Sequence, residues 1–173
     1  MNNMARRSAA AAMELLLAAA LFLLHYTDIL HIGIFGAEPM LLLPFLVSYS
    51  MFREELHAAI AGALTGFFAD GVASGTSFLH TIFFFILCFA IALATHYLLN
   101  NNLRAAVMLS LVSAICYYLL RWLCFFAFTG SGNSIDYLMQ YALPSVIYTA
   151  LFIFPLYFLQ RAIYRMRSKG EVK

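Results

Sequence analysis

Charged residues are scarce in this chain, and their scarcity sets the first limit on its structure. Asp, Glu, Lys and Arg make up only 10% of the 173 residues, whereas 64% are hydrophobic, and the mean hydropathy is +0.87. A soluble domain of this size cannot bury so much apolar surface, so a lipid bilayer must serve as the solvent. About six apolar spans of ~20 residues would use most of the chain. The sequence therefore predicts a single polytopic membrane domain over residues 1–173.

Residues that carry catalysis or bind metals are also few. The three cysteines lie inside apolar blocks, and the eight-residue spacing of Cys116 and Cys124 fits no metal or redox motif. The five histidines form no HxxxH or HExxH pattern, and the sequence contains no P-loop, GxSxG or CxxC motif. Basic residues are too few for nucleic-acid binding. We therefore expect neither an enzyme nor a metal or cofactor site.

The few basic residues are distributed unevenly along the chain. Nine of the ten Lys and Arg residues lie outside the apolar blocks, at the N-terminus, after the second and fourth blocks, and after the last one. Because loops on the cytoplasmic side of a membrane are enriched in Lys and Arg, all nine can be placed on that side. The pattern predicts an all-α integral membrane protein with six transmembrane helices in one bundle and both termini in the cytoplasm.

The expected spans follow the apolar blocks, and prolines punctuate two of them. The spans cover approximately residues 8–26, 39–52, 56–70, 78–98, 103–128 and 137–164. Pro39 suits a first helical turn, where the missing N–H costs nothing. Pro44, Pro144 and Pro155 are expected to kink their helices, because an interior proline removes a backbone hydrogen bond.

The third span contains a small-residue pattern. Gly62 and Gly66 are four residues apart and share a helix face with Ala58, Ala59 and Ala69. Small residues at this spacing allow two helix backbones to approach closely. The pattern predicts either helix packing within one subunit or contact with a partner helix.

Three ionisable residues lie inside the apolar spans. Asp70 and Arg121 both lie ~24–26 Å from the inner face when counted at the helical rise, which suggests an ion pair in the outer leaflet. Separate snorkelling to the headgroups, a ligand site and a partner contact remain alternatives. Glu14 lies near the inner surface at the depth of His96, so it either pairs with that histidine or snorkels toward the basic end.

These features, taken in order, resemble the rod shape-determining MreD family over about residues 5–165. The resemblance is carried by Pro39 opening the second span, and by a third helix with Gly62 and Gly66 that ends at Asp70. The stretch EPMLLLPFLVSYSMFREELHAAIAGALTGFFADGVASGTSFLHT contains this core. The C-terminal segment LPSVIYTALFIFPLYFLQRAIYR, with its two prolines, resembles the ending of the family.

Two positions depart from the family pattern. Met40 stands where an acidic residue is common, and Phe78 stands where a glycine is usual. What the resemblance implies is a non-catalytic scaffold subunit of the cell-elongation machinery in the bacterial inner membrane. Its implied partners are an MreC-like protein, an MreB-like filament, RodA and a class B penicillin-binding protein.

A different class of protein also fits the span count. The substrate-binding subunits of energy-coupling-factor vitamin transporters have six spans and an alanine-rich first helix, as in Ala9–Ala12 here. In that alternative, Asp70, Arg121 and the loop TGSGNSID would surround an outward-facing cavity. Polar residues in the outer halves of the spans are sparse for gripping a vitamin, which favours the scaffold.

Overall fold

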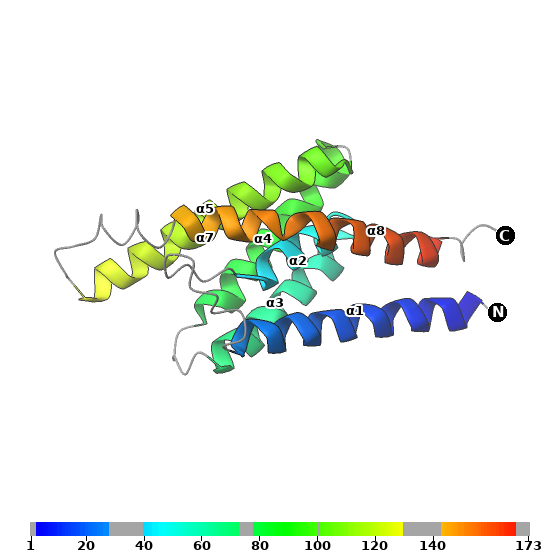
Figure 1. The fold of residues 1–173 in the computed structure, drawn as a ribbon, viewed down its shortest axis with the longest axis horizontal. Coiled ribbons are helices and arrows are strands. Elements are labelled where there is room, and N and C mark those ends of the chain that lie inside the picture. Colours follow the sequence, from blue (N-terminus) through cyan, green and yellow to red (C-terminus); the bar gives the residue numbers. More distant parts are fainter. Residues whose placement is uncertain (1–2, 28–39, 73–77, 100, 130–142, 169–173) are drawn as a thin grey trace.

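The protein is entirely helical over the residues that the structure describes. We analysed a computed structural model, which describes residues 3–27, 40–72, 78–99, 101–129 and 143–168. Its helices, shown in Figure 1, are α1 (Asn3–Tyr26), α2 (Leu42–Ser50), α3 (Glu55–Val72), α4 (Leu79–Tyr97), α5 (Leu103–Thr129), α7 (Leu143–Leu151) and α8 (Ile153–Ser168). The all-α prediction is confirmed.

Four helical segments among the described residues are long and apolar enough to cross a membrane. They are Ser8–Tyr26, Leu79–Tyr97, Leu103–Cys124 and Leu143–Arg167. The helix α2 is shorter than the expected span over residues 39–52. With nine residues it extends over roughly 14 Å at the helical rise, less than the ~30 Å of a bilayer core. The architecture is that of an all-α membrane protein.

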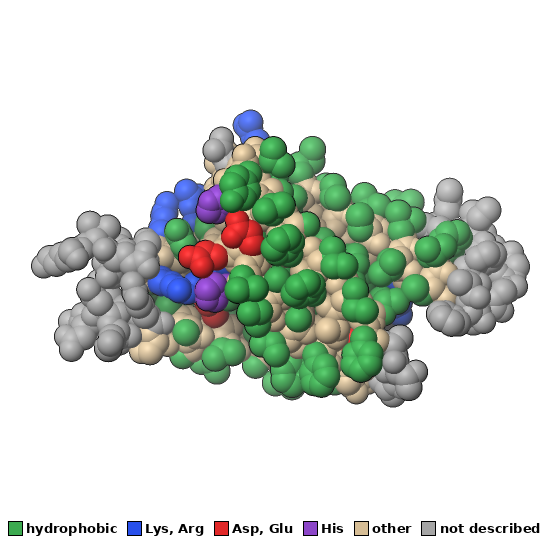
Figure 2. All heavy atoms as spheres, turned by 180° about the vertical axis from the view of Figure 1, so that it is seen from behind, with side chains coloured by type: hydrophobic (Ala, Val, Ile, Leu, Met, Phe, Trp, Pro, Cys, Tyr) green, Lys and Arg blue, Asp and Glu red, His purple; other side chains and the backbone are tan. Residues whose placement is uncertain are grey.

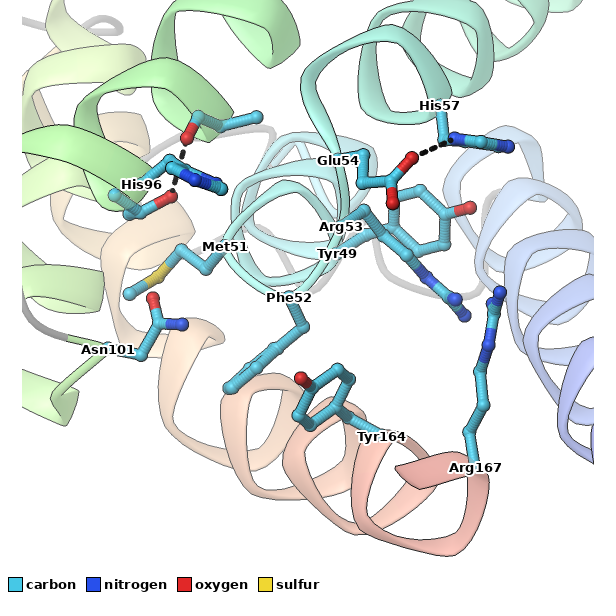
Figure 3. A pocket seen from close by; sticks show the side chains of 12 residues that line it. Tyr49, Met51, Phe52, Arg53, Glu54, His57, His96, Asn101, Tyr164 and Arg167 are labelled. Atoms are coloured by element: carbon cyan, nitrogen blue, oxygen red, sulfur yellow. Dashed lines mark hydrogen bonds and ion pairs between the residues drawn. The ribbon is translucent and has the colours of Figure 1, made fainter. Parts of the chain in front are cut away.

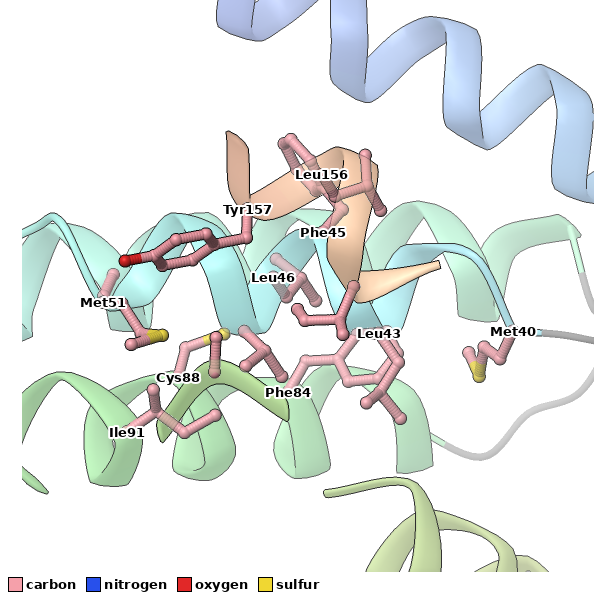
Figure 4. Close-up of a cluster of buried hydrophobic side chains, with 14 of the residues drawn as sticks. Met40, Leu43, Phe45, Leu46, Met51, Phe84, Cys88, Ile91, Leu156 and Tyr157 are labelled. Atoms are coloured by element: carbon pink, nitrogen blue, oxygen red, sulfur yellow. The ribbon is translucent and has the colours of Figure 1, made fainter. Parts of the chain in front are cut away.

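The short helix α2 lies at the centre of the bundle. All of its residues except Tyr49 are buried. It contacts α1, α3, α4, α5, α7 and α8. Figure 4 shows Leu43, Phe45 and Leu46 of this helix between Phe84 and Cys88 of α4 on one side and residues of α8 on the other. A helix that is apolar on every side is stable only when other helices surround it.

The helix α3 has the opposite arrangement of side chains from a helix in a soluble protein. Its buried face consists of small residues and Asp70, namely Ala58, Ala59, Gly62, Gly66, Ala69 and Asp70. Its exposed face carries the large apolar residues Leu56, Ile60, Leu64, Phe67 and Phe68, each at least 47% exposed. Large apolar side chains facing outward are stable in lipid but not in water, which supports a membrane environment.

Pro44 lies at a helix start, so the kink expected there is wrong. It is the third residue of α2, whereas Pro144 lies beside Leu143, where the described part of α7 begins. The backbone N–H groups of a first turn have no intrahelical partner, so proline causes no distortion there. Pro155 differs, because the chain breaks at Phe152 between α7 and α8. Its ring removes the hydrogen bond to the carbonyl of Leu151 that a continuous helix would make.

The start of α1 and the end of α8 lie at the same end of the molecule, which is called the inner end below (Figure 1). Figure 2 shows most of the acidic, basic and histidine side chains of one face gathered at that end, with hydrophobic side chains covering much of the rest. The ion pair Glu14–Arg53 and the contacts of Glu54 with His57 and of Glu55 with His96 come from residues at this end. The opposite end, where α3 ends and α4 begins, is called the outer end.

Candidate functional site: a glycine seam and two buried polar clusters

The helices α3 and α4 are in backbone contact along the two glycines of α3. A Cβ atom added at Gly62 would lie 2.4 Å from the carbonyl oxygen of Phe84, and one added at Gly66 would lie 2.5 Å from that of His80. Real Cβ atoms do not approach backbone atoms so closely, so only glycine fits at either position. The structure therefore uses both glycines for packing within the subunit, the first of the two roles that their spacing suggested.

Asp70 lies where this seam reaches the outer end, and it caps the start of α4. One carboxylate oxygen accepts hydrogen bonds from the backbone N–H of His80 at 3.1 Å and lies 2.7 Å from its Nδ1 atom. The other accepts from the backbone N–H of Thr81 at 2.9 Å and from its hydroxyl at 2.6 Å. The first N–H groups of a helix lack intrahelical partners, and the positive end of the helix dipole favours an anion. Asp70, on the neighbouring helix α3, supplies both the hydrogen-bond acceptors and the negative charge.

The cluster at Asp70 extends to two further helices. The Nε2 atom of His80 lies 3.0 Å from the hydroxyl of Tyr117 on α5. On the other side, the hydroxyl of Tyr26 on α1 donates to the carbonyl oxygen of Ala69 at 3.2 Å. Since Asp70 and Tyr117 are buried, these bonds form in a low-dielectric surrounding, where satisfied polar groups hold helices in one arrangement. The outer cluster thus joins α1, α3, α4 and α5.

The ion pair expected between Asp70 and Arg121 is not observed. Asp70 instead caps the first turn of α4. Arg121 is exposed and has interactions of its own, but it is not among the partners that the described residues give Asp70. The physical reason is helix adjacency. The helix α3 packs most extensively on α4, and its contact with α5 is slight. Equal depth in the membrane therefore did not bring the two charges together.

Glu14 forms the second buried polar contact, at the inner end. Its carboxylate pairs with the guanidinium of Arg53, which follows α2, and the two side chains are only 12% and 9% exposed. The same guanidinium lies over the ring of Tyr49, 5.2 Å from the ring centroid. Neither the pairing with His96 nor snorkelling, which were expected for Glu14, is observed; His96 instead lies 3.7 Å from Glu55. A buried pair needs a partner brought in by folding, and Arg53 supplies it.

The remaining predicted residues fall outside these two clusters. Pro39 lies outside the described residues, while Pro144 lies where the described part of α7 begins and Pro155 lies near the start of α8. No group of three or more His, Cys, Asp or Glu side chains that would suit a metal ion occurs among the residues that the structure describes.

Sequence reasoning missed His80, Thr81, Tyr117 and Arg53 as members of these clusters. One signal was present. Asp70 lies in the last turn of α3, and α4 begins nine residues after it. A carboxylate before such a short connection is well placed to cap the following helix. The partners Tyr117 and Arg53 left no local signal, because they approach from elsewhere in the chain.

Comparison with known proteins gives one match. The family described as rod shape-determining protein MreD matches residues 7–167. The chain belongs to the MreD family. Membership assigns it a role in rod-shape determination and associates it with the rod-shape machinery and the membrane. No curated protein and no solved structure matches the chain. The matched range includes both glycines of the seam, both clusters, and all or nearly all of each described helix.

Proposed function

We propose that this chain is a non-catalytic scaffold subunit of the bacterial cell-elongation machinery, embedded in the plasma membrane. The observation that carries this proposal is the family match, which extends over nearly the whole chain. The proposed partners are an MreC-like protein, an MreB-like filament, RodA and a class B penicillin-binding protein. A scaffold needs a rigid shape rather than reactive groups, and the glycine seam and the two buried polar clusters provide such rigidity.

We also propose six membrane crossings with both termini in the cytoplasm. The grouping of charged side chains at the inner end supports this orientation, since the positive-inside rule assigns the basic end to the cytoplasm. The helices α1 to α5 run in alternating directions, α7 and α8 together would form the last crossing, and α2 would be the second. Its short length is compatible with this role because its side chains are buried in protein. Irregular backbone at membrane depth is tolerated where protein rather than lipid surrounds it.

The vitamin-transporter alternative has less support. It required Asp70 and Arg121 to surround an outward-facing cavity, yet the carboxylate of Asp70 is occupied by the first turn of α4. The family match also favours rod-shape determination over transport. The scaffold function is therefore the better explanation of both observations.

The experiment that tests the scaffold is affinity purification of the tagged full-length chain in mild detergent, followed by mass spectrometry. An unrelated tagged polytopic membrane protein serves as the control. We expect enrichment of an MreC-like protein and of RodA over the control, and loss of rod shape when the chain is depleted from cells. Recovery of transporter ATPases without any elongation protein, in cells that keep their shape, would refute the proposal.

A further inference from the structure

The inner end contains a pocket of about 350 Å³ that the scaffold role leaves without a function. Its walls come from α2, α3, α4, α8 and the segment that follows α2, and they include the aromatic side chains Tyr49, Phe52 and Tyr164. Phe52 and Tyr164 stack with their ring centroids 5.4 Å apart. The volume lies within the usual range of small-molecule sites.

Two arginine side chains enter this pocket from different elements. Figure 3 shows Arg53, which follows α2, and Arg167 of α8 pointing toward one another. Arg53 is held in place by Glu14 and Tyr49. Arg167 is partly exposed and lies within 4 Å of no acidic group among the residues that the structure describes. Because Glu14 offsets the charge of Arg53, the charge of Arg167 is the one that an anion in the pocket would balance.

The acidic side chains around the pocket do not fill this role. Glu14 is already paired with Arg53, and Glu55 lies beside His96. Glu54 is turned toward His57 at 3.3 Å, and its side chain is 79% exposed, as Figure 3 also shows. A guanidinium has five N–H donors, so Arg53 keeps donors free after its contact with Glu14, and no ion pair joins Arg167 to an acidic side chain within the described part of the chain. The pocket therefore offers several charge-assisted donors to a ligand.

Large exposed side chains also occur on the helices that line the pocket. Tyr97 and Leu98, which follow the lining residue His96, are 72% and 83% exposed, and Tyr164 itself is 42% exposed. A ligand that suits both features has an anionic group for the arginines and an apolar part for these side chains. Guanidinium groups bind phosphate in a planar, bidentate geometry.

We propose that this pocket binds the phosphate of an anionic phospholipid, with the acyl chains lying along the large exposed side chains of the lining helices. The lipid would fill the gap between α8 and the segment that follows α2, and so brace the inner end of the bundle. This site does not depend on the scaffold function, because it concerns the bilayer rather than a protein partner.

The test is a thermal-shift titration of the delipidated full-length protein in neutral detergent. The probes are dioleoylphosphatidylglycerol, dioleoylphosphatidylcholine and inorganic phosphate. Arg167→Gln removes one charge from the pocket, Arg167→Lys keeps it, and Arg165→Gln removes an exposed charge from the same helix outside the pocket. The melting temperatures without lipid check that each variant folds.

We expect phosphatidylglycerol to stabilise the wild type more than phosphatidylcholine does. In Arg167→Gln, the half-saturating concentration should rise about fivefold, as expected for the loss of one basic residue at a membrane surface. Arg165→Gln should stay within about twofold of the wild type. Arg167→Lys should fall between the wild type and Arg167→Gln, because an ammonium keeps the charge but not the bidentate geometry. An equal effect of Arg165→Gln would indicate diffuse attraction to the basic helix end and overturn the site.

The other measurements distinguish a lipid phosphate from free inorganic phosphate as the ligand. If phosphatidylglycerol and phosphatidylcholine stabilise the wild type equally, an anionic-lipid site is excluded. This measurement needs no variant. Stabilisation by inorganic phosphate as large as that by phosphatidylglycerol would exclude the lipid and identify a soluble phosphate as the ligand.

Discussion

At the scale of single residues, Asp70 and Glu14 act as partners for groups inside the folded protein. They accept hydrogen bonds from backbone N–H groups or pair with a charged side chain. Asp70 accepts hydrogen bonds from two backbone N–H groups of α4, from a histidine ring and from a hydroxyl. Glu14 neutralises the buried guanidinium of Arg53. Both determine where one helix stands against another.

The cap made by Asp70 leads to a first prediction. Asp70→Asn keeps the shape of the side chain but replaces one accepting oxygen by an NH2 group. That group is a donor, so at least one N–H of α4 loses its acceptor. We expect the free energy of unfolding in detergent to fall by about 1–3 kcal/mol, because a buried N–H loses its acceptor. Thermal unfolding measures the loss. Glu54→Gln, at an exposed carboxylate, is the control, and an equal effect of both changes would argue against the cap.

The pair between Glu14 and Arg53 leads to a second prediction. Glu14→Gln or Arg53→Gln alone leaves one buried charge without its partner, so each should destabilise the protein. The double variant should be less destabilised than the sum of the two, with a coupling energy of about 0.5–3 kcal/mol. A thermal-unfolding cycle over the four proteins gives this energy. Additive costs would mean that the charges do not interact.

At the scale of helices, α3 and α4 form the tightest unit of the molecule. The small side chains of α3 face α4, and its large apolar side chains face outward. In lipid, no hydrophobic force drives two apolar helices together, so close packing and polar contacts must hold the pair. The glycine seam provides the packing along the helices, and Asp70 provides the polar contact at their outer end.

The glycine seam leads to a third prediction, and the chain contains a matched control. Gly66→Ala places a Cβ 2.5 Å from backbone atoms of α4, whereas a Cβ at Gly71 of the same helix meets nothing within 4 Å. Gly66→Ala should lower the melting temperature and the folded yield because α3 and α4 must separate. Gly71→Ala should be neutral or slightly stabilising, because alanine favours a helix by about 0.5–1 kcal/mol over glycine. Equal tolerance of both changes would show that the seam is not tightly packed.

At the scale of the whole molecule, one end is charged and most of the remaining surface is apolar. The inner end carries most of the acidic, basic and histidine side chains of the face seen in Figure 2, and large exposed apolar residues lie on α1, α3, α4, α5, α7 and α8. Such a surface serves both lipid and partner helices. Partner helices would therefore recognise the proposed scaffold by its shape and by small polar contacts rather than by hydrophobicity alone.

The proposed topology leads to a fourth prediction. A reporter fused after Lys173 should report the cytoplasm, and one inserted within residues 130–134 should report the exterior, because an odd number of crossings separates them. Alkaline phosphatase and green fluorescent protein, which are active on opposite sides of the membrane, measure this directly. The same compartment at both positions would rule out six crossings.

Much of the fold could be predicted from the sequence because the decisive signals are local. The apolar blocks and the scarcity of charge predicted an all-α membrane protein, and the order of prolines, glycines and Asp70 indicated the MreD family. Both predictions are confirmed. The spacing of Gly62 and Gly66 predicted close helix contact, since helical periodicity alone places both on one face.

What only the tertiary structure decided is which residues meet. Depth along the membrane normal follows from counting residues, and it placed Asp70 level with Arg121. Lateral position depends on which helices are neighbours, and α4 rather than α5 lies beside α3. For the same reason Glu14 met Arg53 instead of His96. Contacts between distant segments follow from the packing of all the helices together, and no local pattern in the chain specifies them.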